Sequence, residues 1–338
     1  MGFLANYIPN LASIAAFRQP RRPLLFSYYV THRCPLACRY CSDGAGRPFK
    51  EDAVDELPTD QAKKLIDLLR RDCDTLDITG GEPMLRPDLE DLLAHARKIG
   101  FRTVLNTKGM GLSERPDLIR LSNVLVLSVD SLDVSRLAAI IGGSAEAAAN
   151  IFTALHWAVE NWRRYETRVV LSVVAMPDKL DDVSEVLHFA ARRKLGFQLS
   201  PQIVGTTVHP GLWGNERFRA LMDEVIVAKA GGASVLGLGR YLRGIRDGRP
   251  YTCHPLLMPT IRPDGTVNLP CLERPRERVD LKTADRYSQV LTRARIADAS
   301  TRDCRGKCHI FCHMALSLLQ RHPLAALGEL RAWRSPSC

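Results

Sequence analysis

Nine of the ten cysteines in this sequence fall in or near two clusters, and Cys73 stands apart. The first cluster, Cys34, Cys38 and Cys41, has the spacing C-x3-C-x2-C. Three thiolates could hold three irons of a cubane [4Fe–4S] cluster and leave the fourth iron open to a ligand. A zinc site completed by His32 is the alternative, because zinc also binds Cys and His side chains.

A second group of cysteines lies toward the C-terminus. Its members are Cys253, Cys271, Cys304, Cys308 and Cys312. Five clustered thiols are hard to explain by packing alone, and they could hold a second metal centre. Two alternatives stay open. Zinc could bind here with help from His309 or His313, or thiols at every fourth position could lie on one buried helix face.

Polar residues follow several predicted strands. Residues 77–83 read DITGGEP, in which a Gly-Gly turn would let the backbone approach a ligand closely and Glu82 could accept a hydrogen bond from an ammonium group. Asn106 ends the next strand, and Ser128 and Asp130 end the one after it. The last two could bind hydroxyl groups, or they could cap the helices that follow.

Strands alternate with helices through the first two thirds of the chain, which predicts βαβ units and a parallel sheet. The predicted strands cover residues 24–30, 76–79, 102–106, 124–129, 168–175 and 197–203. The predicted helices between and after them cover residues 59–71, 86–99, 115–121, 145–162, 183–194 and 214–229. Six strands are too few for a closed eight-stranded barrel, so we expect an α/β fold with a partial (βα)6 TIM-like barrel. Ligands bind at the carboxyl ends of such strands, where these polar residues lie.

Taken together, these motifs resemble the radical S-adenosylmethionine (SAM) superfamily, whose signature is C-x3-C-x-aromatic-C, with Tyr40 as the aromatic residue. The resemblance implies a [4Fe–4S] cluster on Cys34, Cys38 and Cys41, with SAM on the open iron. It also implies that 80–83 is the family's GGEP motif, which holds the SAM amino group. The glycine-rich motif of the family's fifth strand is not evident. The SAM contacts implied are Tyr40, Gly80, Gly81, Glu82, Pro83, Asn106, Ser128, Asp130 and Ser172.

Residues 262–271 look like a β-hairpin, with Asp264-Gly265 as its turn. The segment resembles the hairpin of SPASM and twitch extensions, where G-x-V-x-x-C carries a ligand of an auxiliary [4Fe–4S] cluster. The later C-x3-C-x3-C departs from the spacing of those domains. The resemblance implies one auxiliary cluster, with the thiols at 304, 308 and 312 as ligands and Cys271 or Cys253 as the fourth.

The 338 residues divide by pattern into three parts. An amphipathic segment with a basic linker covers residues 1–23, the partial barrel covers 24–240, and a smaller Cys-rich extension with a terminal helix covers 241–338. No run of 18 apolar residues occurs and no signal peptide is evident, so we expect a cytoplasmic protein. The net charge of +10 comes from scattered Lys and Arg without a nucleic-acid-binding motif, which argues against a nucleic-acid partner.

The resemblance implies reductive cleavage of SAM to a 5′-deoxyadenosyl radical, which abstracts hydrogen from an unactivated C–H. A ferredoxin or flavodoxin would supply the electron. Residues 3–17 have helical apolar spacing that would place Asn6, Asn10 and Ser13 on the polar side, so they could rest on a membrane or pack on the barrel. We therefore expect a hydrophobic small-molecule substrate, such as an isoprenoid lipid or a tetrapyrrole, with peripheral membrane contact. A peptide-modifying enzyme and a non-catalytic zinc or iron–sulfur scaffold are the alternatives.

Overall fold

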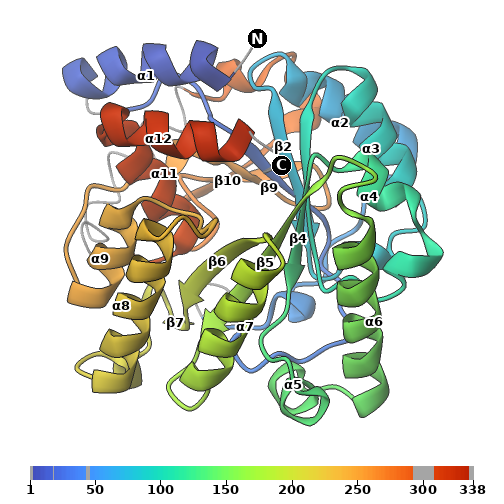
Figure 1. Ribbon diagram of the computed structural model, residues 1–338. Helices are drawn as coiled ribbons and strands as arrows, with labels where there is room; N and C mark the ends of the chain where they lie inside the picture. Colours follow the sequence, from blue (N-terminus) through green and yellow to red (C-terminus); the bar gives the residue numbers. More distant parts are fainter. Residues whose placement is uncertain (1–2, 18, 43–45, 292–307, 335–338) are drawn as a thin grey trace.

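A nine-stranded sheet lies at the centre of the computed structural model, which describes residues 3–17, 19–42, 46–291 and 308–334 (Figure 1). Its order is β11-β10-β9-β1-β2-β3-β4-β5-β6, and all pairs from β9 to β6 are parallel. The strands are β1 (Phe26–Thr31), β2 (Thr75–Gly80), β3 (Arg102–Thr107), β4 (Val124–Ser128), β5 (Arg168–Ala175), β6 (Gly196–Pro201), β9 (Thr260–Ile261), β10 (Thr266–Leu269) and β11 (Glu277–Asp280). A separate small hairpin pairs β7 (Ile203–Val204) with β8 (Thr207–Val208).

Helices connect and cover the parallel strands, which confirms the predicted partial barrel. They are α1 (Phe3–Phe17), α2 (Thr59–Arg70), α3 (Leu89–Lys98), α4 (Asp117–Leu121), α5 (Val134–Ile141), α6 (Ala145–Asn161), α7 (Leu180–Arg192), α8 (Glu216–Ala230), α9 (Gly239–Asp247), α11 (Phe311–Arg321) and α12 (Pro323–Arg334). All six predicted strands are present, and their ends differ from the prediction by no more than two residues. Helices α5 and α9, which are short, were not predicted.

The two faces of the sheet have different environments because side chains alternate along each strand. On the outer face, apolar side chains join the main core with the surrounding helices. On the inner face, Val124, Val126 and Val170 form a separate apolar cluster that packs against Phe311 of α11. Nearer the carboxyl ends the inner face turns polar and stays partly accessible. Its half-buried polar residues are Asp77, Thr79, Asn106, Ser128, Ser172, Gln198 and Ser200.

The predicted hairpin at 262–271 is present and extends the sheet beyond β1. Ser27 of β1 aligns with Thr260 of β9 in parallel, and β10 then pairs antiparallel with both β9 and β11. The turn residue Gly265 has φ +81°, a left-handed conformation that favours glycine. The hairpin therefore continues the barrel wall, while the division of the chain at residue 240 stays a prediction.

Helix α1 is oriented opposite to the expectation from its apolar spacing. Asn6, Asn10 and Ser13 are buried, whereas Ile8 is 60% exposed. The physical reason is hydrogen bonding: the Asn10 side chain accepts from the Arg22 backbone N–H at 2.9 Å, and the Asn6 side chain donates to backbone carbonyls. Tyr7 of α1 joins a small core cluster with α12, so the two helices lie side by side at one end of the molecule (Figure 1).

Helices long and apolar enough to cross a bilayer singly are absent from the described residues. Only α5 and α6 taken together would pass such a test, and they are bent by 113° at their junction.

Candidate active site

The three cysteines of the first cluster lie on the loop that follows β1. Cys34 and Cys38 are half-buried, and the Cys41 backbone N–H donates to the Cys38 carbonyl at 3.0 Å, which closes a turn. Cys41 is exposed at its surface, and partial desolvation together with the nearby sulfurs of Cys38 and Cys34 raises the pKa of its thiol. Because thiolates at these positions would repel one another, binding to a cationic metal centre would stabilise the charged form that ligates metal.

The three thiols could hold an iron–sulfur cube or take part in a zinc site. In a cube each thiolate binds a different iron, so the sulfurs stand further apart than the ligands of one ion. Within the described ranges, no three His, Cys, Asp or Glu side chains are placed to hold a single metal ion. His32, the proposed fourth zinc ligand, lies with Nδ1 3.0 Å from the Asp52 carbonyl oxygen and packs against Tyr29 and Phe49. Nε2 of His32 is buried and has no hydrogen-bond partner among the described residues, so the zinc alternative stays open on geometry alone.

Helix α5 fixes the conformation of the cysteine loop. The backbone N–H groups of Ala37 and Arg39 donate to the carbonyls of Ile141 and Ile140 at 2.9 and 3.1 Å. These carbonyls end the helix, where intrahelical partners are lacking. Gly142 caps the helix with φ +57°, and a Cβ atom there would lie 2.6 Å from the Ala37 carbonyl oxygen. The loop therefore depends on glycine at this position.

Substituting Gly142 by alanine should displace the cysteine loop and reduce the iron bound after anaerobic reconstitution. Gly111→Ala is the matched control, because Gly111 also has positive φ (+79°) but its Cβ would meet nothing closer than 3.9 Å. Both variants should lose about 1 kcal/mol of folding free energy from backbone strain. Only Gly142→Ala should lose iron, and equal iron content in the two variants would contradict this role.

The two glycines at the end of β2, Gly80 and Gly81, are required by the chain's own packing. The Gly81 N–H donates to the Thr31 carbonyl and the Glu82 N–H to the Arg33 carbonyl, both at 2.8 Å. A Cβ atom on Gly81 would lie 2.3 Å from the Arg33 carbonyl oxygen, and one on Gly80 would lie 2.2 Å from that of Thr31. The sequence predicted that a ligand would approach these glycines closely, but the backbone segment leading to Cys34 does so instead. Contact of the two glycines with SAM stays a prediction.

The Glu82 carboxylate is buried and held by three donors. One oxygen accepts from the Met84 backbone N–H at 3.0 Å and from the Thr107 hydroxyl, and the other accepts from the Lys108 backbone N–H at 2.9 Å. Burial raises the pKa of Glu82, and these hydrogen bonds oppose the rise. A carboxylate oxygen can accept two hydrogen bonds, so one position on the second oxygen remains for an ammonium donor. Pro83 follows and begins a short 3₁₀ helix.

Tyr40 and Asp130 contact each other directly, and both contact Lys108, which was not among the predicted site residues. Both the Tyr40 hydroxyl, at 2.6 Å, and the Lys108 ammonium, at 2.7 Å, donate to Oδ2 of Asp130. Oδ1 of Asp130 accepts from the Val174 N–H of β5. Burial alone would lower the pKa of Lys108, but Asp130 and the Cys38 thiol outweigh it and raise that pKa. The sequence offered one signal for Lys108 as a site residue, which is its position directly after Thr107, the last residue of β3.

The three remaining predicted SAM contacts share the polar part of the inner face. Asn106 pairs in register with Val126, and Ser128 pairs with Ser172 on the next strand. All three side chains are half-buried. The structure thus brings them to the same edge as Asp130, as the strand order required.

Asp77 was also missed as a functional candidate. It lies on the inner face of β2, where Oδ2 accepts from the Ser27 hydroxyl at 3.0 Å and Oδ1 has no hydrogen-bond partner among the described residues. Burial raises the pKa of this carboxyl to about 7. A carboxyl that titrates near neutral pH beside an accessible inner face suits proton transfer.

The second cysteine group separates into two environments. Cys253 and Cys308 both interact with Tyr251 and raise its pKa in addition to the effect of burial, and Cys308 likewise raises the pKa of Cys271. Cys312 instead faces Asp77 and Tyr241. Cys304 lies outside the described residues. The ligand set of an auxiliary cluster stays a prediction, with Cys253, Cys271 and Cys308 the thiols that lie together.

The alternative of a single helix face is wrong for Cys308. Helix α11 begins at Phe311, so Cys308 lies in the segment before the helix, whereas Cys312 is helical. His313, named for a zinc alternative, is buried, and burial lowers the pKa of its imidazole to about 4.

Comparisons with known proteins bear on the fold and on residues 28–190. Residues 28–190 match the family model described as "Radical SAM superfamily". Streptococcus suis SuiB bound to S-adenosylmethionine is 16% identical, with 85% of this chain and 70% of that chain covered and a TM-score of 0.62. SuiB bound to precursor peptide SuiA is 15% identical, with 85% and 68% covered and a TM-score of 0.61. The protein anSMEcpe with bound AdoMet is 15% identical, with 91% and 98% covered and a TM-score of 0.60.

Identities this low show a shared fold alone, and the family match concerns residues 28–190. The SPASM or twitch character of the extension stays a prediction. Residues 28–190 of this chain form a radical SAM superfamily domain.

Proposed function

We propose that this protein is a radical SAM enzyme that abstracts hydrogen from an unactivated C–H. The observation that carries the proposal is the convergence of three elements: the cysteine loop after β1, the Gly80–Gly81 turn packed against it, and the Tyr40–Lys108–Asp130 group beside it. When bound, a [4Fe–4S] cluster and SAM would supply reductive cleavage to a 5′-deoxyadenosyl radical.

The chain's own residues would bind and orient these groups. Cys34, Cys38 and Cys41 would hold the cluster. Glu82 offers its remaining acceptor position to the SAM ammonium, and the half-buried inner-face residues offer hydrogen bonds to its hydroxyl and ring atoms. These polar residues are Asn106, Ser128 and Ser172. Apolar packing deeper on the inner face, around Val126 and Phe311, would exclude water from that side.

For the substrate we propose a hydrophobic small molecule, reached with peripheral membrane contact. The support is α1, which contains no charged residue and turns Leu4 and Ile8 outward. Leu324 at the start of the neighbouring α12 is exposed as well. Apolar side chains beside a basic linker suit an anionic membrane face. A ferredoxin or flavodoxin as reductant, and an auxiliary cluster near Cys253, Cys271 and Cys308, belong to the same proposal.

A peptide substrate is the second candidate, because two proteins of the same fold are named with peptides. SuiB is described with precursor peptide SuiA, and anSMEcpe with the Cp18Cys peptide. Liposome co-sedimentation separates the two candidate substrates. A substrate presented by a membrane requires that the protein bind liposomes and that this binding depend on the exposed face of α1, whereas a peptide substrate does not require it.

A Cys38→Ala variant should bind less iron and form no 5′-deoxyadenosine, because one cluster ligand is removed. The measurement is iron and sulfide per chain after anaerobic reconstitution, with 5′-deoxyadenosine assayed after dithionite reduction. Cys73→Ala is the matched control, since Cys73 is buried away from the site and its thiol bonds only the Thr75 carbonyl among the described residues.

The iron content of the unaltered protein also tests the second cluster. About eight irons per chain with SAM turnover would support one auxiliary cluster, and about four would assign the second cysteine group to another role. Bound zinc without any 5′-deoxyadenosine would contradict the proposed function and favour a scaffold.

A further inference from the structure

Arg262, the residue directly after β9, presents an unpaired edge of its guanidinium group inside the protein. The residue is only 3% exposed. Its Nη1 donates to Oδ2 of Asp52 at 2.7 Å. Nε and Nη2 are buried and have no hydrogen-bond partner among the described residues. Two buried donors without acceptors are unfavourable, which indicates that a ligand group completes them.

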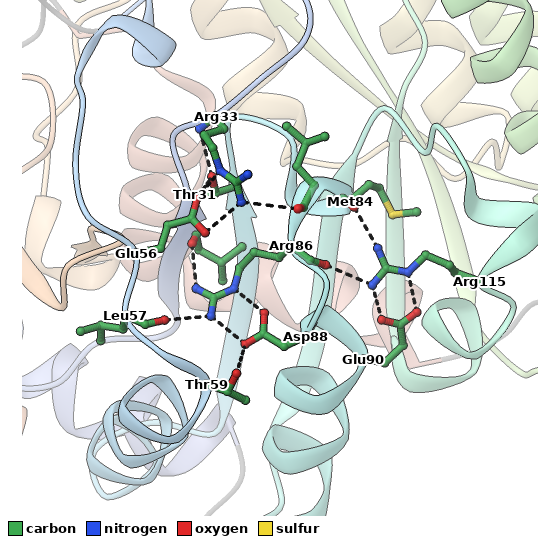
Figure 2. A network of polar contacts seen from close by, with 12 residues as sticks. Thr31, Arg33, Glu56, Leu57, Thr59, Met84, Arg86, Asp88, Glu90 and Arg115 are labelled. Carbon is green, nitrogen blue, oxygen red and sulfur yellow. Dashed lines mark hydrogen bonds and ion pairs between the residues drawn. The ribbon is translucent and has the colours of Figure 1, made fainter.

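Other arginines of this protein show what such an edge binds. Nε and Nη2 lie side by side on the guanidinium and can donate two parallel hydrogen bonds to one carboxylate. Three bidentate pairs of this kind are seen in Figure 2: Arg33 with Glu56, Arg86 with Asp88, and Arg115 with Glu90. In Arg86 the two distances are 2.7 and 2.8 Å. Arg262 has the same edge free of any partner from the described chain.

The free edge belongs to the inner face of the barrel. Ile261 and its partner Val267 are part of the main core on the outer face, so alternation places Arg262 on the opposite face. Tyr29 of β1 faces the same side, and Asn268 of β10 lies there as well, with its Oδ1 buried and without a partner in the described segments. Arg262 therefore stands on a polar wall built by β9, β10 and β1.

This wall is distinct from the predicted SAM contacts. Apart from Tyr40 on the loop after β1, those contacts lie on β2 to β5 and the loops after them, whereas β9 is the neighbour of β1 on its other side. We propose that Arg262 is a recognition residue for a second ligand and that it binds a carboxylate group of the substrate through Nε and Nη2. The identification of this ligand as substrate rests on the proposed function, and the binding site itself does not.

Acetate is the probe for this site. The experiment measures the unfolding midpoint of the full-length reconstituted protein as acetate replaces chloride at constant ionic strength. A ligand that binds the native state raises that midpoint in a saturable way. Arg262→Gln should weaken acetate binding about tenfold, because two charge-assisted hydrogen bonds are lost. Asp52→Asn should strengthen it, because the competing carboxylate on Nη1 is removed while Arg262 remains.

The matched control is Arg246→Gln. Nε and Nη2 of Arg246 already bond Asp247 at 2.7 and 3.1 Å, so acetate binding should equal that of the unaltered protein. If Arg262→Gln fails to fold, the opposite shift in Asp52→Asn still tests the site. An acetate effect that is identical in the unaltered protein and in both site variants would overturn the proposal. Stabilisation by phosphate but not by acetate would overturn the carboxylate assignment.

Saturating SAM separates the two sources of a carboxylate. Acetate binding that persists in the presence of SAM supports a second ligand. Its loss on addition of SAM would assign Arg262 to the SAM carboxylate and overturn the inference. Acetate binding without any 5′-deoxyadenosine formation would contradict the proposed function but support the Arg262 site. Failure of the proposed function can therefore be told apart from failure of this inference.

Discussion

Replacing Lys108 by methionine is expected to lower the free energy of unfolding by about 3–5 kcal/mol, as when one partner of a buried ion pair is removed. Lys108 and Asp130 are both buried, and their charged atoms are 2.7 Å apart. Without the ammonium group, the carboxylate keeps only the Tyr40 hydroxyl and the Val174 N–H as donors. Urea unfolding of the metal-free protein measures this loss independently of the cluster.

The Lys108→Met, Asp130→Asn double variant should recover part of the loss, because no unpaired charge then remains buried. Lys282→Met is the control: Lys282 is exposed and lies 3.5 Å from Asp280, so its pair should contribute less than about 1 kcal/mol. Since the folded pKa of Lys108 is raised above its usual 10.5, its contribution should be constant through neutral pH and be lost only as pH rises through the folded value. A Lys108→Met variant as stable as Lys282→Met would contradict the ion pair's role.

The fold could be predicted from the sequence because its signals are local. Each central strand is a short apolar run followed by a helix with 3.6-residue periodicity, and the turn chemistry of Asp264-Gly265 marked the hairpin. The cysteine loop and the residues at the strand ends were found for the same reason. Parallel strands bring their carboxyl ends to one edge, so separate motifs had to converge there.

Contacts across the sheet could not be predicted. Lys108 joins Tyr40 and Asp130 only because the register of β3 against β4 brings the following residues together. The orientation of α1 was wrong because apolar spacing was weighed without the backbone groups of residues 21–23, to which Asn10 and Asn6 bind. Likewise, sequence spacing suggested one helix for Cys308 and Cys312, whereas the helix begins between them.

Replacing Arg86 by methionine should also cost about 3–5 kcal/mol of unfolding free energy, since Asp88 would lose its buried cation. Arg86 is buried between three segments and satisfies an acceptor in each (Figure 2). It donates to the Val30 carbonyl of β1 at 3.1 Å, to the Leu57 carbonyl before α2 at 2.9 Å, and to Asp88 before α3. Loss of the guanidinium would leave two backbone carbonyls without this donor, which adds to the cost.

Arg86→Lys should recover only part of the stability, because a single ammonium cannot reproduce the planar fork that reaches Asp88 and both carbonyls. Arg33→Met is the matched control: its side chain is 59% exposed, so its pair with Glu56 should contribute less than about 1 kcal/mol. Thermal and urea unfolding of the metal-free variants supply the comparison.

Val30 lies four residues before Cys34, so Arg86→Met should also reduce iron binding in the fraction that stays folded. A folded Arg86→Met protein with full iron content would mean that the hydrogen bonds of Gly81 and Glu82 to the Thr31 and Arg33 carbonyls hold the cysteine loop without this arginine.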